Sequence, residues 1–167
     1  MSEAAVETKE KVESKQTLSI NQFYLKNAHL DVTTPMHLIE GEYKPEAKMD
    51  LDTQHVRYNE THFAVEVKIS ISLSMDKPIF DLKLTQGGLF VITGCDDQQL
   101  HQVIHATCPD IVFPYVRQAV TNITSQAGFP AVNLSHYDFA LRYRASIEQA
   151  AKAATKAATK AKTKAKS

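Results

Sequence analysis

The sequence predicts an α+β domain, in which a four-stranded antiparallel sheet is followed by a long kinked helix and a C-terminal helix. Two segments in the first half have apolar residues at every second position, which is the period of strands with one buried face. After residue 95 the apolar residues recur at helical spacing. Strands followed by helices, without alternation of the two, are typical of the α+β class. The 167 residues suffice for one domain with a substantial core.

The two clearest strand segments are 42–52 and 63–75. In the first, the odd positions are apolar and the even positions are all charged; in the second, apolar residues alternate with mostly polar ones. Such alternation indicates strands with one wet face, hence an antiparallel sheet. Pro45 has no N–H to donate to a ladder, so we expect its strand to lie at an edge or to be bulged there.

Segments 18–32 and 79–94 are the other two predicted strands. The alternation of the first slips between Ile20 and Phe23, which predicts a bulge or a strand covered on both faces. The second contains Gly87-Gly88, so we expect a strand broken there, where two residues without Cβ permit a bend or a close backbone approach. Residues 33–41 are predicted to form a loop that carries apolar side chains.

Helices are predicted from residue 96 onwards. Asp96 or Asp97 can cap a helix over 98–107. Pro109 suits the first turn of a new helix, where a missing N–H costs little. Pro114 follows about one turn later and predicts a kink near the start of that helix.

The chain after this long helix is predicted to form a linker and a last helix. Gly128 is placed to end the long helix, and 129–139 is expected to be extended. Ser135, with Asp138 three residues on, forms a sequence-level capping box for the last helix.

Composition divides the chain into three parts. We expect 1–17 to be disordered, 18–148 to form the domain, and 149–167 to be an Ala/Lys-rich basic tail. The tail holds six lysines and no acid, so the rest of the chain has 19 − 6 = 13 basic against 19 acidic residues, about −6. We expect a solvated tail rather than a contact with nucleic acid, a membrane surface or another acidic partner. It has no aromatic residue to stack on bases.

Several classes of protein are disfavoured by what the sequence does not contain. No apolar run approaches the ~18–20 residues of a membrane span, and no signal peptide is apparent, so membrane insertion is not expected. Two cysteines do not make a disulfide framework, so we expect a cytoplasmic protein. A nucleophile elbow, a phosphate loop and a dinucleotide fingerprint are all missing, so we expect neither an enzyme nor a cofactor.

One motif favours a different class, a metal-binding enzyme. His101, His105 and Cys108 recur at i, i+4 and i+7 on one helical face, and nitrogen and sulfur ligands at this spacing can hold zinc. A histidine pair at i, i+4 is more often exposed or packed, and no CxxC accompanies it. We therefore expect no metal but keep this alternative open.

Three longer motifs carry a family resemblance. Residues 86–90 read QGGLF, residues 108–117 read CPDIVFPYVR, and residues 128–134 read GFPAVNL. In this order they resemble the SecB family, cytosolic bacterial chaperones that hold secretory precursors unfolded, and the similarity covers about 18–145. The resemblance implies the fold already predicted, assembled as a tetramer that is a dimer of dimers.

The resemblance also implies a function and its partners. We expect an ATP-independent chaperone that binds unfolded precursor polypeptides and delivers them to the SecA motor. A promiscuous binder of this kind uses adaptable apolar surfaces rather than a shaped catalytic pocket. The client groove would lie between the loop after the first strand and the linker-plus-last-helix region, although several of its candidates are expected to be ordinary core. The groove candidates are Met36, Leu38, Tyr43, Met49, Leu51, Phe129, Val132, Leu134, Tyr137 and Phe139.

Two further surfaces follow from the resemblance. The positions of the acidic patch that contacts SecA are occupied here by Asn27, Asp31, Asp81 and Lys83, of which only two are acidic. Nearby acids in 42–52 offer substitutes, so we expect salt-sensitive binding of SecA. The subunit interface is expected at or near Leu82, Leu84 and Gln86. A related alternative is a SecB-like dedicated chaperone for another client, such as an antitoxin.

Overall fold

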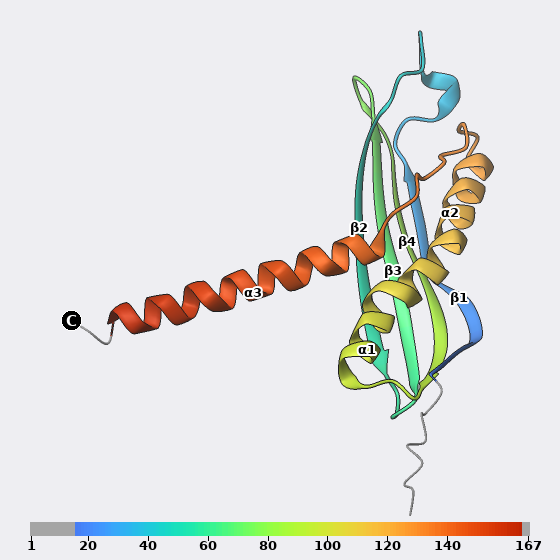
Figure 1. The fold of residues 1–167 in the computed structure, drawn as a ribbon. Helices are drawn as coiled ribbons and strands as arrows, with labels where there is room; N and C mark the ends of the chain where they lie inside the picture. Colours follow the sequence, from blue (N-terminus) through green and yellow to red (C-terminus); the bar gives the residue numbers. More distant parts are fainter. Residues whose placement is uncertain (1–15, 165–167) are drawn as a thin grey trace, which may run out of the picture.

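The predicted sheet is present in the computed structural model, which describes the backbone of residues 16–164 and the side chains of residues 16–152 (Figure 1). Its four antiparallel strands lie in the order β1-β4-β3-β2, so that β1 and β2 are the edges. The edge position of β2 agrees with the expectation from Pro45, which immediately precedes this strand. Most of the predicted disordered segment lies outside the described residues. The strands are β1 (Thr17–Val32), β2 (Glu46–Arg57), β3 (His62–Ser74) and β4 (Pro78–Thr93).

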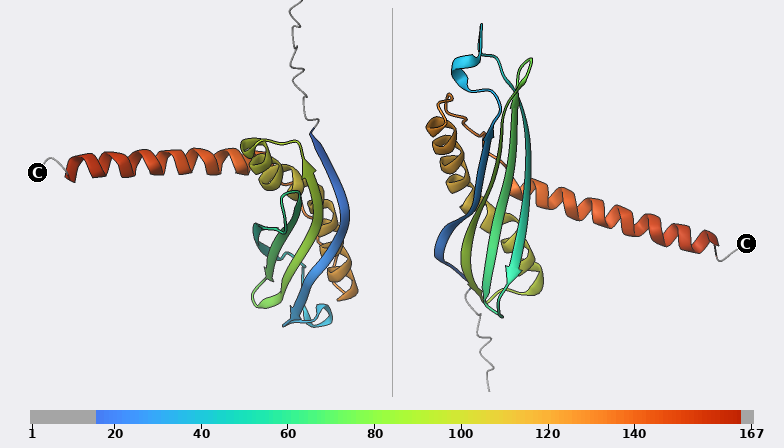
Figure 2. Two further views of the ribbon diagram at one scale, coloured as in Figure 1. Left: turned by 90° about the horizontal axis from the view of Figure 1, so that it is seen from below. Right: turned by 180° about the vertical axis from the view of Figure 1, so that it is seen from behind.

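The helices cover one face of this sheet and leave the other face open (Figure 2). The covered, inner face is apolar because odd residues of β3 and even residues of β4 point towards the helices and are buried, as Ile69 and Leu84 illustrate. Each large aliphatic side chain removed from water in this way contributes about 1.5–3 kcal/mol to folding. The outer face carries the intervening polar residues, so any docking surface on it is built from the sheet alone.

The predicted irregularity of β1 is confirmed. Its pairing with β4 shifts register between Ile20 and Gln22, and again between Leu25 and Asn27. Each bulge changes which side chains face the helices, which explains why the apolar alternation slips there.

The break predicted at Gly87-Gly88 is wrong, because β4 pairs with both neighbours through the two glycines. Close packing on both faces explains these residues instead. A Cβ on Gly87 would lie 2.4 Å from the Tyr24 ring on the outer face. A Cβ on Gly88 would lie 2.7 Å from the Phe90 ring and 3.1 Å from Val112 of the long helix.

The long helix is continuous, and this corrects the prediction of two separate helices. It comprises α1 (Asp97–Gln102), a π-helical turn η2 (Val103–Thr107) and α2 (Cys108–Gln126). Asp96 caps its start, in a capping box with Gln99.

The prolines explain why the middle of this helix is irregular. The Cys108 N–H donates to the Val103 carbonyl, which widens the turn that precedes Pro109. In a regular α-helix the ring of Pro109 would clash with the carbonyl of residue 105, so the wider turn allows the chain to continue. Pro114 lies inside α2 on its exposed side, and the helix runs through it.

The end of α2 follows the sequence prediction, but the start of the last helix does not. Gly128, at φ +83°, ends α2. The last helix α3 (Phe139–Lys164) is capped by Asp138, whose Oδ1 accepts from the Leu141 N–H at 2.8 Å. Ser135 therefore lies in the linker and does not cap it.

Helix α3 runs away from the body of the molecule (Figures 1 and 2). The backbone of the predicted tail is helical as far as Lys164, and the last three residues lie outside the described part. No helix in the described residues is long and apolar enough to cross a membrane.

Candidate functional site

The structure divides the predicted client-groove residues into three groups by burial. Four are buried in the core of the single chain, as was expected for several of the candidates, and their side chains line no open surface there: Leu51, Phe129, Leu134 and Phe139. Four more are half-buried and pack against the core: Met36, Tyr43, Val132 and Tyr137. Leu38 and Met49 remain, with exposed fractions of 61% and 50%.

The buried members form an aromatic cluster that holds the linker in place. The Phe129 ring lies 5.1 Å from that of Phe80 in β4. The Tyr137 and Phe139 rings lie 4.8 Å apart, and both contact Phe113 of α2. Phe129 therefore attaches the linker to the sheet, while Tyr137 and Phe139 attach the start of the last helix to α2. The resemblance had assigned all three residues to the groove.

A hollow of mixed polar and apolar lining lies beside Leu38, where the short helix η1 (Met36–Leu38) connects β1 to β2. Its volume is about 340 Å³. Ile39, Met75 and Ile79 supply further apolar lining that the sequence analysis did not select. The β3–β4 turn meets the β1–β2 connection here, and nothing in local sequence indicates that contact.

Arg142 ties the start of α3 to the edge strand β2. Its Nη1 donates to the Leu51 carbonyl at 2.7 Å and to the Tyr137 hydroxyl at 3.2 Å. Its Nη2 lies 3.6 Å from Asp52 Oδ1. These contacts fix where the helix leaves the sheet, close to the exposed side chain of Met49.

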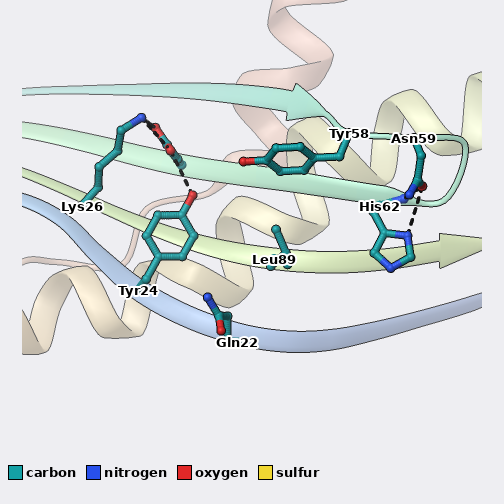
Figure 3. Close-up of a pocket in the computed structure, with 8 residues that line it drawn as sticks. Gln22, Tyr24, Lys26, Tyr58, Asn59, His62 and Leu89 are labelled. Atoms are coloured by element: carbon teal, nitrogen blue, oxygen red, sulfur yellow. Dashed lines mark hydrogen bonds and ion pairs between the residues drawn. The ribbon is translucent and has the colours of Figure 1, made fainter.

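On the outer face, Glu66 is the centre of a polar network that the sequence analysis missed (Figure 3). Its side chain is buried, with the residue only 4% exposed. Lys26 Nζ lies 2.8 and 2.9 Å from its two oxygens, the Tyr24 hydroxyl donates at 3.0 Å, and Gln54 donates as well. The network joins residues from β1, β2 and β3, so no local sequence motif predicts it.

The electrostatics of this network favour a charged carboxylate. Burial raises the pKa of Glu66, but the hydrogen bonds from Lys26, Gln54 and Tyr24 outweigh burial and hold that pKa below its usual value. Burial, followed by the hydrogen bond to Glu66, raises the pKa of Tyr24 to about 12. Because its oxygens are occupied by donors of the same chain, Glu66 anchors the outer face and is poorly placed to transfer protons.

A shallow hollow of about 600 Å³ adjoins this network. Tyr24 and Tyr58 stand on either side of Leu89 in Figure 3, and Asn59 and His62 close one end. The Asn59 Oδ1 accepts from the backbone N–H of His62 at 2.8 Å, which fixes the turn between β2 and β3.

The four residues at the SecA-patch positions share the outer face and lie in three successive rows of β1 and β4. Asp31 and Asp81 are directly opposite each other across β1 and β4. Asn27 and Lys83 lie in the adjoining rows of the same two strands. Ser72 donates to Asp81 at 2.5 Å, so this carboxylate has a partner in its own chain.

The predicted interface residues are used within the chain. Leu82, Leu84 and Gln86 lie on the inner face of β4 and are buried beneath the long helix. Their role between subunits stays a prediction, but these side chains already pack in the core of one chain. Exposed apolar residues that are available to a second subunit include Ile20 and Leu25 on the edge strand β1 and Tyr115 on α2.

The structure contradicts the metal alternative at Cys108. This side chain is fully buried in the core, and burial raises the pKa of its thiol to about 12. His101 and His105 do lie together, with ring centroids 4.3 Å apart, and His55 of β2 takes the third position at 4.8 Å from His105. Among the described residues, no group of histidine, cysteine or acidic side chains is arranged to hold a metal ion.

The histidine rings instead pack against α3. His101 Nδ1 and the Tyr143 hydroxyl are 2.9 Å apart, and the His105 ring stacks parallel to that of Tyr143. Burial, followed by repulsion from His101 and His55, lowers the pKa of His105, which favours the neutral ring in this stack.

An open sheet face and exposed apolar residues beside a tethered linker are features typical of proteins that bind polypeptides. Comparison with known proteins identifies the family to which this chain belongs. Residues 11–150 match the family model described as preprotein translocase subunit SecB. The protein-export protein SecB of Alkalilimnicola ehrlichii is 32% identical over 139 residues, which cover 83% of this chain and 74% of that protein.

A solved structure shares the fold. It is a SecB-like chaperone from Mycobacterium tuberculosis in complex with a peptide from the HigA1 antitoxin. The match has a TM-score of 0.62 at 14% identity and covers 72% of this chain and 90% of that one. The chain described here belongs to the SecB family of protein-export chaperones.

Proposed function

We propose that this protein binds unfolded precursor polypeptides in the cytoplasm without ATP, keeps them competent for translocation, and delivers them to the SecA motor. The observation that carries the client-binding part is the exposure of Leu38 and Met49. Large apolar side chains that stay half or more exposed are available to unfolded chains, and Leu38 also lines a hollow with Ile39, Met75 and Ile79. Methionine adds the adaptability that binding many sequences requires.

The proposed client surface is smaller than the set of residues implied by resemblance. It consists of Leu38 and Met49 with the half-buried Met36, Tyr43, Val132 and Tyr137. The four buried members act indirectly, because they position the linker that borders this surface.

We propose a homotetramer that buries the exposed apolar residues of β1 and α2. The Phe23 and Tyr115 rings are stacked 4.0 Å apart between these two elements, and Tyr115 is still 41% exposed. As an edge of the described sheet, β1 also offers unpaired backbone groups to a second chain. A closed symmetric assembly would cover both features.

Delivery to SecA is proposed to use the acidic pair Asp31 and Asp81, with the exposed Asp50 and Asp52 of β2 on the same face. Each exposed charge contact contributes at most about 1 kcal/mol, so we expect a weak interaction that depends on salt. The lysines of the tail would add a second contact or none.

The experiment has two arms. Suppression of aggregation of a chemically unfolded secretory precursor, without ATP, tests client binding. Titration with the zinc-bearing tail of SecA at low and high salt tests delivery. Failure of the first arm would contradict the chaperone proposal.

Client binding without any SecA binding at low salt would favour the second candidate, a dedicated chaperone for a client such as an antitoxin. The mycobacterial SecB-like chaperone, solved in complex with an antitoxin peptide, supports keeping that candidate.

A further inference from the structure

Six polar side chains form a shallow depression in the middle of the outer sheet face, which we call the basic cup. It has a volume of about 450 Å³, with Ile69 and Leu84 at its base. Register brings its residues together: His29 and Ser70 both pair with Lys83, while Asn27 and Lys68 both pair with Thr85. The cup consists of Asn27, His29, Lys68, Ser70, Lys83 and Thr85.

The polar side chains of the basic cup have no partner in the part of the chain that the structure describes. Among the side chains that the structure describes, none of the six forms a hydrogen bond, an ion pair or a ring contact. The neighbouring polar groups differ in this respect. Lys26, next to the cup, is held by both oxygens of Glu66.

Two of the four acids that border the cup are engaged by other residues. Asp52 lies directly opposite Lys68 in the ladder, but its carboxylate is 3.6 Å from Arg142 of α3. Asp81, two residues from Lys83, accepts a hydrogen bond from Ser72. Lys68 and Lys83 occupy diagonal positions on adjacent strands. Within the described residues neither forms an ion pair, and like charges this close on a sheet repel.

We propose that the basic cup is a binding site for one oxyanion group, a carboxylate or a phosphate. Such a group would sit between Lys68 and Lys83 and relieve their repulsion. Ser70, Thr85 and Asn27 would donate neutral hydrogen bonds to its remaining lone pairs.

The surroundings of the cup limit the size and charge of the ligand. Asp31 and Asp81 bound it on one side, and Asp50 and Asp52 on the other. A polyanion such as nucleic acid would bring further phosphates over these carboxylates, whereas a single anionic group would not. The proposal holds whether or not SecA docks on this face, because it rests on residues of the cup alone.

The test is a two-dimensional NMR titration of the full-length protein at constant ionic strength. The probes are inorganic phosphate and N-acetylglutamate methylamide, and the glutamine analogue is the neutral control. We expect saturable shifts of the backbone amides of the cup with one or both anions and none with the neutral control. The tighter of the two anions identifies the preferred chemistry.

Substitutions then assign the site. We expect Lys68→Gln and Lys83→Gln each to weaken binding about fivefold at most, the double substitution to weaken it more, and Lys83→Arg to retain it. Lys48→Gln, on the same face but outside the cup, is the matched control. Thermal unfolding checks that each variant is folded. Shifts that do not saturate, that spread over all lysines, or that persist in the double variant would overturn the proposal.

Discussion

The ring of Tyr24 lies directly over Gly87, and a Cβ on that glycine would come within 2.4 Å of the ring. Substitution of Gly87 by alanine must therefore displace Tyr24 and disturb its hydrogen bond to Glu66. We expect Gly87→Ala to lower the free energy of unfolding by about 1–3 kcal/mol, as overpacking does elsewhere. Urea denaturation at fixed protein concentration measures this.

A double-mutant cycle separates this clash from other effects of alanine. Tyr24→Ser removes the ring, so the cost of Gly87→Ala should largely disappear in that background. An unchanged cost would mean that the glycine is required for its backbone and not for the ring above it.

Glu66 should make stability depend on pH in the acid range. Its pKa is lowered in the folded protein, so its contribution is present above the unfolded pKa of about 4.3. The contribution is lost as the pH falls through the lower, folded value. We expect Glu66→Gln to cost about 1–3 kcal/mol at neutral pH and less at pH 3. Denaturation at several pH values checks this, with the exposed Glu60→Gln as the control that changes little.

Client binding should depend on Leu38 and Met49. Replacement of either by serine removes exposed apolar surface, so stability should hardly change while the Kd for an unfolded client rises about fivefold. Fluorescence anisotropy with a labelled unfolded precursor measures this. Val56→Ser is the matched control, because Val56 is 45% exposed but lies on the outer face of β2, away from the proposed client surface. Equal effects of all three substitutions would contradict the proposed surface.

Assembly should depend on Tyr115. We expect Tyr115→Ala to shift the protein towards smaller species, because it removes a half-exposed ring that stacks on Phe23. Light scattering at micromolar concentration measures the mass. Tyr58→Ala serves as the control, since Tyr58 is exposed on the other side of the sheet. A monomeric wild type would refute the tetramer itself.

The two cysteines should differ in reactivity. Cys108 is buried and its thiol pKa is raised to about 12, so it should resist an aromatic disulfide reagent at pH 8. Cys95 is half-buried, and we expect it to react first. Both thiols should react in denaturant, and mass spectrometry of the labelled peptides identifies the order. Rapid labelling of Cys108 in the folded protein would contradict its place in the core.

The local elements of this fold are well determined by the sequence alone. Alternation of apolar and charged residues specifies the strands, because successive side chains point to opposite faces. Gly128 specifies the end of the long helix, because the chain needs a positive φ there. The three family motifs identify the class of protein, and the family comparison confirms it.

Tertiary structure alone decided how those elements are used. Met49 and Leu51 have the same place in the alternation of one strand, yet Leu51 is buried and Met49 is half exposed. Burial depends on which elements pack together although they are far apart in the sequence. The periodicity of apolar residues does not indicate which elements these are.

The same reason applies to the glycine pair and to the polar surfaces. Gly87 has its explanation in Tyr24 of another strand, and the Glu66 network draws on three strands. Lys68 and Lys83 form no ion pair within the described residues, while the neighbouring Asp52 contacts Arg142 of the distant helix α3. Sequence specifies which groups are present and which local elements carry them, whereas the packing of distant segments decides which of those groups are left free to bind.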